Sequence, residues 1–228
     1  MIATPKLLVR DDTPREDHFV HLRGATWKDY ERVLAIRGDH SAPRIAYLHG
    51  TLEIMSPSRS HESLKSDIGC LVEVWCLERG VEFSTYGSWT LKIKRLKLGL
   101  EPDECYIFGP RGRAKVPDLA IEVVWTSGGL DKLDIYRPLG VREVWVWQRG
   151  KIVPHVLGRS GYKPAARSAA LPGIDLAELA ACIDEPSTSA AVKRFRAHLT
   201  DRELDKALAS GRAKPGVWKR LKRKHGLK

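Results

Sequence analysis

The sequence lacks several features that would assign it quickly to a class of proteins. No stretch of its 228 residues approaches the roughly 20 consecutive apolar residues of a membrane-spanning helix. Residues 1–10 lack the apolar run and the cleavage-site pattern of a signal peptide. The four cysteines show no CxxC spacing, which argues against a zinc site or a redox motif. We therefore expect buried thiols in a cytosolic protein that forms no disulfides and does not enter a membrane.

Acidic residues are fewer than basic ones, and the imbalance is local. The chain has 39 Lys and Arg against 28 Asp and Glu, which gives a net charge of +11. Residues 187–228 hold 13 basic and 3 acidic residues, whereas residues 1–186 hold 26 and 25. A nearly neutral body therefore precedes a strongly basic tail. The hydrophobic content of the chain, 43%, is enough to form a core. The positive net charge suggests a polyanionic partner.

Apolar periodicity predicts alternating helices and strands along the body of the chain. Residues 1–24 show no clear pattern, and the basic residues 94–101 suggest a loop. The order of elements indicates an α/β fold with a mixed sheet. Helices are predicted over residues 26–36, 59–79 and 130–139. Strands are predicted over residues 44–48, 52–55, 81–93 (with an interruption at Gly87), 103–108, 116–125, 141–148 and 152–157.

Carboxylates on two consecutive strands are the first candidates for chemistry. Asp103 begins one strand, and Asp118 and Glu122 share one face of the next because side chains alternate along a strand. The opposite face of that strand is entirely apolar, so Glu122 lies in a strand that is expected to be buried. An unpaired carboxylate there is costly. Either a divalent metal ion shared with Asp103 or a paired Arg or Lys at the end of the sheet must compensate the charge.

Two helices contribute further polar candidates. In the predicted helix 59–79, His61 falls near the apolar stripe and Glu62 points almost opposite, so His61 is expected to face the sheet. His61 is then either a hydrogen-bonded core residue or a ligand. Lys132 and Tyr136 lie one turn apart on the helix that follows the acidic strand. This placement distinguishes Lys132 from an ordinary solvated charge.

These residues carry a family resemblance. Asp103 and Glu122, separated by 18 residues, resemble the acidic pair of the PD-(D/E)XK nuclease superfamily. More closely, six segments in order resemble the Uma family of restriction-endonuclease-like proteins, over about residues 26–184. These segments are LEIMSP (52–57) followed by His61, EPDE (101–104), VPDLAIEV (116–123), DKL (131–133) with Tyr136, LGVREVW (139–145) and LPGID (171–175).

The resemblance implies a fold and an activity. The implied fold is a restriction-endonuclease-like core over residues 1–185, with a central mixed sheet flanked by helices. A basic helical extension would follow over residues 186–228. The implied activity is hydrolysis of DNA by an endonuclease that depends on Mg²⁺ or Mn²⁺. Cleavage of both strands would suit a homodimer.

The resemblance also implies roles for individual residues. Asp103 and Glu122 are the implied metal ligands, Asp118 is a candidate third ligand, and His61 would complete or orient the site. In the superfamily, two strand carboxylates hold the ion on the scissile phosphate, and a lysine positions the water that attacks it.

That lysine is missing from its usual place. Two residues after Glu122 the chain has Val124. Lys132 is the predicted replacement, and Lys92 and Lys94 are alternatives. A second hypothesis therefore stays open, namely a catalytically weak nucleic-acid-binding or interaction protein on the same scaffold.

The basic tail predicts contact with nucleic acid. Two helices are predicted over residues 190–199 and 202–210, before a basic segment at 215–228. Such a run can neutralise phosphates and give salt-sensitive binding that depends little on sequence. The alternative is a solvated tail. The predicted nucleic-acid-binding residues are Lys219, Arg220, Lys222, Arg223 and Lys224.

Overall fold

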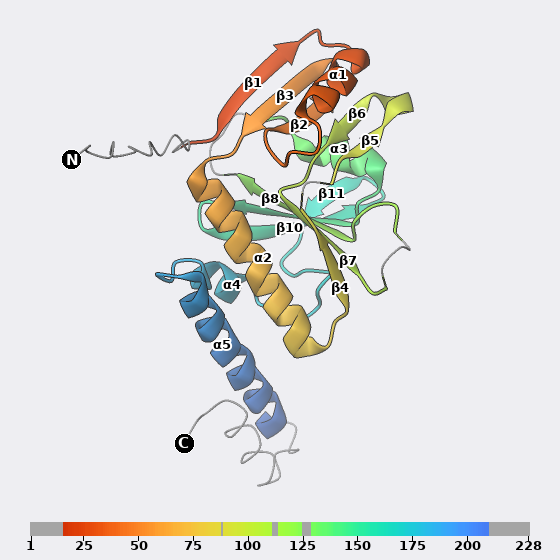
Figure 1. Cartoon of the computed structure of the whole chain (residues 1–228). Helices are drawn as coiled ribbons and strands as arrows, with labels where there is room; N and C mark the ends of the chain where they lie inside the picture. The colour runs from red at the N-terminus through yellow and green to blue at the C-terminus, as the bar shows by residue number, and fades with distance from the viewer. Residues whose placement is uncertain (1–15, 88, 111–113, 125–128, 210–228) are drawn as a thin grey trace, which may run out of the picture.

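The computed structural model describes residues 16–87, 89–110, 114–124 and 129–209 (Figure 1). Within these ranges no helix is both long and apolar enough to cross a membrane. The elements in chain order are β1 (His18–Arg23), α1 (Trp27–Arg37), β2 (Arg44–Leu48), β3 (Thr51–Ser56), α2 (Arg59–Arg79), β4 (Phe83–Tyr86), β5 (Leu91–Ile93), the 3₁₀ helix η1 (Lys94–Leu96), β6 (Leu98–Leu100), β7 (Glu104–Phe108), β8 (Leu119–Val124), α3 (Lys132–Leu139), β9 (Glu143–Gln148), β10 (Lys151–Gly158), β11 (Gly161–Pro164), α4 (Leu176–Cys182) and α5 (Thr188–Ala209).

A five-stranded antiparallel sheet has the strand order β1-β3-β2-β6-β5. Its β2–β3 hairpin turns through two residues, His49 and Gly50, whose φ angles of 47° and 84° suit a tight hairpin turn. Helix α1 covers one face, where Trp27 and Tyr30 pack against Tyr47. This sheet forms the upper part of the molecule in Figure 1.

A six-stranded mixed sheet has the order β11-β10-β9-β8-β7-β4. Strands β8 and β9 run parallel, and the other neighbouring pairs are antiparallel. Helix α3 connects β8 to β9, as a parallel pair requires a crossover. Ligands of α/β sheets commonly bind beyond the carboxyl ends of parallel strands, and Glu122 and Val124 lie near that end of β8.

The two faces of β8 are covered by different elements. Leu119, Ile121 and Val123 belong to a core with α2, α4 and α5, and Figure 1 shows α2 crossing this sheet beside α5. Ala120 belongs to a second core, which α3 and strands of the five-stranded sheet complete. Glu122 shares the face of Ala120, and therefore lies where α3 and the two sheets meet.

The predicted fold class is confirmed, because a mixed sheet is flanked by helices. The predicted helix 26–36 is α1, with a capping box at Thr26, and helix 59–79 is α2, with Ser58 as its N-cap and a left-handed Gly80 at its end. Of the four cysteines that were predicted to be buried thiols, Cys76, Cys105 and Cys182 are buried free thiols, whereas Cys70 is a free thiol of intermediate exposure.

The predicted strand 81–93 is wrong as a single element. Phe83–Tyr86 pairs with β7 in the six-stranded sheet, whereas Leu91–Ile93 pairs with β6 in the five-stranded sheet. The chain therefore passes between the sheets near Gly87. The predicted loop 94–101 is also wrong, since it contains η1 and β6.

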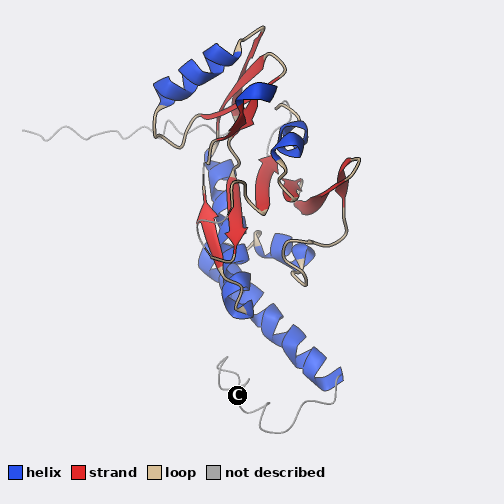
Figure 2. Cartoon of the chain, turned by 90° about the vertical axis from the view of Figure 1, so that its right-hand side faces the viewer, coloured by secondary structure: helices blue, strands red, loops and turns tan. Residues whose placement is uncertain are grey.

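Three further elements differ from the predictions. β1 lies in residues 1–24, where the sequence shows no clear pattern, and β11 extends the final strand pair. The two helices predicted at 190–199 and 202–210 are one helix, α5, whose far end extends beyond the rest of the described chain in Figure 2. The five predicted nucleic-acid-binding residues of the tail lie outside the described residues, as does Trp125, the last residue of the predicted strand 116–125.

Candidate active site

Asp103 and Glu122 lie together in the structure. Strands β7 and β8 pair Glu104 with Ile121, so continuing the register by one residue places Asp103 opposite Glu122. Oδ2 of Asp103 accepts a hydrogen bond from the backbone N–H of Val123 at 2.7 Å. Asp103 is 0% exposed and Glu122 is 4% exposed, so two carboxylates share a buried position.

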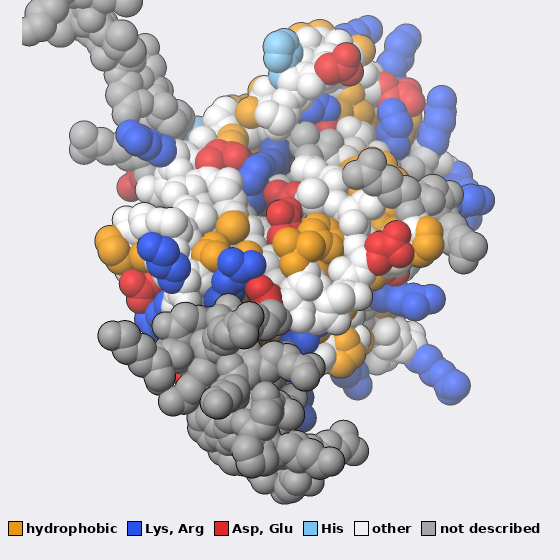
Figure 3. All heavy atoms as spheres, turned by 60° about the horizontal axis from the view of Figure 1, so that its bottom comes forward, with side chains coloured by type: hydrophobic (Ala, Val, Ile, Leu, Met, Phe, Trp, Pro, Cys, Tyr) orange, Lys and Arg blue, Asp and Glu red, His pale blue; other side chains and the backbone are white. Residues whose placement is uncertain are grey.

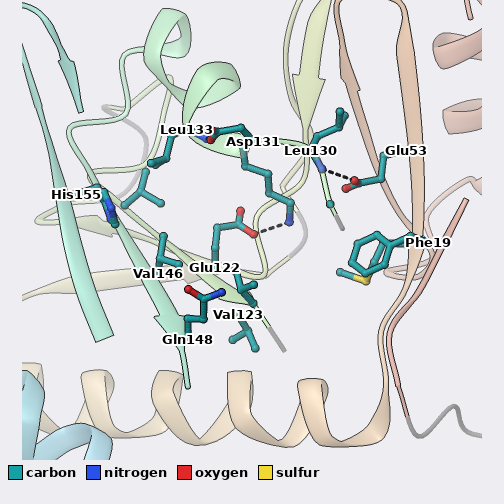
Figure 4. Close-up of a pocket in the computed structure, with 15 residues that line it drawn as sticks. Phe19, Glu53, Glu122, Val123, Leu130, Asp131, Leu133, Val146, Gln148 and His155 are labelled. Atoms are coloured by element: carbon teal, nitrogen blue, oxygen red, sulfur yellow. Dashed lines mark hydrogen bonds and ion pairs between the residues drawn. The ribbon is translucent and has the colours of Figure 1, made fainter. Parts of the chain in front are cut away.

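Helix α3 brings two donors to Glu122. Nζ of Lys132 lies 2.5 Å from Oε2 of Glu122, and the hydroxyl of Tyr136 donates to Oε1. Lys132 and Tyr136 are one helical turn apart and so share a face. The start of α3 is fixed by Asp131, which accepts a hydrogen bond from the N–H of Leu133 at 3.0 Å. The ion pair is drawn as a dashed line in Figure 4.

The charges around Glu122 shift its proton affinity and that of its partner. Burial raises the pKa of Glu122, the positive charge of Lys132 lowers it, and the negative charge of Asp103 raises it. Together these effects leave the pKa of Glu122 at about 7. Burial alone would lower the pKa of Lys132, but the charges of Glu122 and Asp103 raise it above its usual value. Lys132 is therefore a cation at neutral pH and can donate hydrogen bonds, but it has no free lone pair with which to accept a proton.

Asp103 is paired with a cation from the other sheet. Arg44, at the start of β2, donates to Oδ1 of Asp103 and, over 2.8 Å, to Oε1 of Glu62. Burial would raise the pKa of Asp103, but the charges of Arg44 and Lys132 outweigh it and hold the pKa well below its usual value. Of the two compensations that the sequence left open, the structure shows a paired Arg or Lys for each carboxylate.

His61 faces the sheet, as its place near the apolar stripe predicted. Its Nδ1 lies 2.9 Å from Oδ2 of Asp17, and its Nε2 lies 3.1 Å from Oδ1 of Asp103. Burial opposes the charged imidazole, but the contacts with these two carboxylates raise the pKa of His61 to about 9. Ser58 caps α2 and accepts from the His61 N–H at 3.1 Å. Glu62 is instead 40% exposed.

The structure does not bring Asp118 to this site. It precedes Glu122 by four residues, a translation of about 13 Å along a strand. Its carboxylate accepts from the backbone N–H of Phe108 at 2.9 Å, and it lines a different cavity. Lys92 and Lys94 are also elsewhere, exposed at the β5–β6 hairpin, and Lys94 is 79% exposed. Among the three predicted lysines, Lys132 is the one at Glu122.

A cavity of about 510 Å³ opens beside Glu122 and Lys132. Phe19 of β1 and Glu53 of β3 line one side, and His155 of β10 lines the other, with Glu122 between them in Figure 4. Glu53 is held in place, since its Oε2 accepts from the N–H of Leu130 at 2.6 Å and lies 2.9 Å from Nε2 of His21. The site is thus accessible from a cavity between the two sheets.

Comparison with known proteins identifies the family. Residues 27–181 match the Uma2 family, which is described as a putative restriction endonuclease. The chain belongs to the Uma2 family. The match runs from α1 to α4, so it contains Asp103, Glu122 and Lys132 and omits β1 and α5. The predicted resemblance is confirmed.

A search of solved structures found a crystal structure of a putative nuclease belonging to DUF820 from Anabaena variabilis. It is 12% identical, with a TM-score of 0.44, over 71% of the present chain and 96% of the Anabaena chain. No curated protein matches the sequence.

Some residues of this candidate site were missed by sequence reasoning. Arg44 begins the strand β2, whose other residues are apolar, and Glu53 lies between the apolar Leu52 and Ile54 of β3, which is the kind of signal that singled out Glu122. The same signal could have found both. Asp17, which contacts His61 and accepts from the N–H of Ser58 at 2.8 Å, precedes β1 and carries no such signal.

The donor set of this site is compatible with Mg²⁺ or Mn²⁺. Within the described part of the chain, no group of three or more His, Cys, Asp or Glu is placed to hold a metal ion. Asp103 and Glu122 nevertheless supply hard carboxylate oxygens, and Mg²⁺ is commonly bound by one or two carboxylates together with water and substrate phosphate. Such an ion would share these oxygens with Arg44 and Lys132.

Proposed function

We propose that this Uma2-family protein is a metal-dependent endonuclease that hydrolyses DNA, with Asp103 and Glu122 as ligands of Mg²⁺ or Mn²⁺. One observation carries the proposal. Two buried carboxylates lie side by side near the end of a parallel strand, and a charged lysine lies 2.5 Å from one of them at the wall of an open cavity. Such buried charges are costly to a fold and are concentrated at functional sites.

The residues around the carboxylates have distinct tasks in this proposal. A bound divalent ion would polarise the phosphate and activate water. Lys132, as a cation, stabilises negative charge on the reacting phosphate and orients the water by donating a hydrogen bond. Tyr136 fixes the orientation of Glu122, and Arg44 and His61 fix that of Asp103.

The position of Lys132 supports an enzyme more strongly than the sequence did. Val124 stands where the superfamily has its lysine, but α3 delivers Lys132 to the same carboxylate. The alternative, a catalytically weak nucleic-acid-binding protein, is supported by a different observation. Arg44 and Lys132 already neutralise both carboxylates without a metal ion. Calorimetric titration with Mn²⁺ separates the two, because the enzyme requires binding that depends on Asp103 and Glu122.

Cleavage assays test the proposal directly. Purified protein is incubated with Mg²⁺ or Mn²⁺ and with single-stranded, duplex and supercoiled DNA. We expect Glu122→Gln and Asp103→Asn to lower the rate by at least about a hundredfold. Glu104→Gln is the control, because Glu104 adjoins Asp103 but points toward Gly69 of α2 and accepts from Thr85. Equal cutting by the wild type and Glu122→Gln contradicts the proposal.

Some finer assignments stay predictions. These are DNA as the substrate, a homodimer, the cytosolic location, and the division between residues 1–185 and 186–228. The structure adds that part of the predicted extension packs on the core, since Ala191, Phe195 and Leu199 of α5 are buried there.

A further inference from the structure

The cavity beside Glu122 has a shape and composition that the proposed hydrolysis does not itself require. Its volume of about 510 Å³ lies within the range of about 300–1,000 Å³ that is typical of small-ligand pockets. It is bounded by the five-stranded sheet on one side and by β8, β9 and β10 on the other. Glu122 and Lys132 line it, so a group bound here would adjoin the proposed reaction centre.

The walls toward β9 and β10 are apolar. Val124, Val144 and Val146 stand on one face of the parallel strand pair, and Leu133 of α3 faces them across the cavity. On the far side of Glu122, the ring of Phe19 contributes an aromatic surface. Such walls suit the flat faces of an aromatic ring.

The charges in the cavity argue against a free anion as its occupant. Glu53, Glu122 and Asp131 line it, and Lys132 is the only Lys or Arg among its described lining residues. Lys132 is already paired with Glu122. A phosphate placed away from Lys132 would face carboxylates, whereas a neutral ring would not be repelled.

Two polar side chains at the apolar end of the cavity can form hydrogen bonds with the edge of an aromatic ring. The amide of Gln148 offers both a donor and an acceptor. Nδ1 of His155 lies 3.1 Å from the carbonyl oxygen of Val153, which can only accept, so Nδ1 carries the proton. This leaves Nε2 of His155 as an acceptor in the neutral ring. Both side chains lie at the cavity in Figure 4.

We infer that the cavity receives one unstacked nucleobase next to the phosphodiester that Glu122 and Lys132 act on. Val146 and Leu133 would contact its faces, and Gln148 and His155 would bind its edge. A base within a continuous duplex is stacked and cannot enter such a pocket. The substrate class is therefore DNA with an unpaired or single-stranded nucleotide. The inference rests on the proposed nuclease function for its substrate.

The test measures binding in a chelator, so that cutting does not interfere. Three duplexes of one sequence are compared: one fully paired, one with a single unpaired nucleotide, and one with an abasic site at that position. We expect the unpaired base to bind about tenfold more tightly than the abasic site, because the abasic site lacks the apolar ring surface that the cavity would bury. Equal affinity for these two ligands overturns the inference.

Variants locate the effect in the cavity. Leu133→Trp fills the pocket and is expected to reduce the ratio of the two affinities to about one. Gln148→Leu should lower this ratio several-fold. If Leu133→Trp does not fold, the Gln148→Leu variant decides the test. Lys151→Met is the control, because Lys151 pairs with Gln148 across β9 and β10 but does not line the cavity. It should leave the ratio of the two affinities unchanged. A ratio that persists in both cavity variants contradicts the inference.

The outcome is separable from that of the nuclease proposal. If the protein cuts DNA in a way that depends on Glu122 but shows no preference for the unpaired base, the nuclease proposal stands and the assignment of the cavity to a nucleobase is wrong. If the protein cuts none of the DNA forms but prefers the unpaired base, and Leu133→Trp abolishes that preference, the nucleobase pocket stands and the nuclease proposal is wrong.

Discussion

Asp103 and Glu122 each depend on a cation from a different element, Arg44 from β2 and Lys132 from α3. Removing one member of a buried pair leaves its partner charged and uncompensated, which costs more than the pair contributes. Substitutions such as Glu122→Gln and Lys132→Met keep the approximate size of the side chain, but they still leave the partner charge without its counter-charge. Activity of any variant at these positions needs a matching measurement of stability.

Lys132 is predicted to be the lysine that serves the reaction. We expect Lys132→Met to lower the cleavage rate by about 10²–10³-fold, as for removal of one donor that stabilises developing charge. Lys92→Met and Lys94→Met should change it by a few-fold at most, because both side chains are exposed on the β5–β6 hairpin. Single-turnover rates on saturating DNA provide the measurement. A large decrease in Lys92→Met with a small one in Lys132→Met would reverse the assignment.

His61 is predicted to make stability fall as the pH rises. Its folded-state pKa of about 9 exceeds the unfolded value of 6.5, so the folded protein holds this proton more tightly. The stabilisation is complete below about pH 6.5 and disappears as the pH rises through about 9. In His61→Gln we expect this part of the pH dependence to vanish. Denaturant unfolding from about pH 6 to about pH 10 measures it, with the exposed His40→Gln as control.

Sequence reasoning found the acidic pair because a carboxylate in an apolar strand is conspicuous. It placed Asp103, Glu122, His61 and Lys132 in one site, and the structure brings their side chains together. It could not separate Asp118 from Glu122, because alternation puts both on one face and says nothing of distance along it. Glu122 has neighbours from α3 and Asp103 from β2, whereas Asp118 binds the end of β7.

Among the elements, the β5–η1–β6 hairpin is a second candidate surface for nucleic acid. It exposes Lys92, Lys94, Arg95 and Lys97, and contains no acidic residue. The ion pair between Lys94 and Glu31 is weak, since Nζ lies 3.9 Å from the carboxylate and the lysine is largely solvated. Figure 3 shows Lys and Arg side chains projecting along the upper right edge, the side on which Figure 1 places β5 and β6. Helix α3 packs on both strands and also carries Lys132.

The hairpin is predicted to contribute to affinity rather than to chemistry. We expect the double variant Lys92→Glu with Arg95→Glu to weaken DNA binding at least several-fold. The log–log slope of affinity against salt should become shallower by up to about 0.9 for each phosphate that the variant no longer neutralises. Lys151→Glu with Lys163→Glu makes the same change of charge on β10 and β11 and serves as control. Equal weakening by both pairs would mean that net charge, and not the hairpin, determines affinity.

Element prediction succeeded where local signals decide and failed where sheet pairing decides. Helices α1 and α2 have side-chain caps at Thr26 and Ser58 and a glycine just beyond their ends, all of which are readable in sequence. β1 has mostly exposed side chains and exists because it pairs with β3 along its whole length. Likewise, the sequence of residues 83–93 alone does not show that β4 and β5 belong to different sheets. The sheet of a strand is determined by the strand it pairs with, and that partner can be distant in the chain.

At the scale of the whole molecule, the basic C-terminal region has two unlike parts. Helix α5 packs on α2 and α4, and its Thr188 and Arg196 contact Asp67 and Glu78 of α2 at 2.6 and 2.9 Å. It therefore belongs physically to the folded body. Residues 210–228 carry 8 Lys and Arg and no acidic residue. The charge surplus of the chain is thus concentrated after the last described helix.

Two truncations are predicted to separate these parts. A chain that ends at residue 209 should unfold at nearly the same temperature as the full chain, and should bind DNA more weakly and with less salt dependence. A chain that ends at residue 187 also removes Phe195 and Leu199 from the core, at about 1.5–3 kcal/mol each. That sum is a large part of the roughly 5–15 kcal/mol that stabilises a typical domain, so we expect a much lower unfolding temperature or no folding.

Thermal unfolding and DNA titration on both truncations decide where the folded domain ends. If the chain ending at 187 unfolds like the full protein, the division near residue 185 is correct and the packing of α5 contributes little stability. If the chain ending at 209 keeps the full affinity and salt slope, the tail does not contact DNA. The hairpin residues Lys92 and Arg95 would then be the remaining candidates for phosphate contact among the basic groups considered, and the neutral body rather than the tail would hold the nucleic acid.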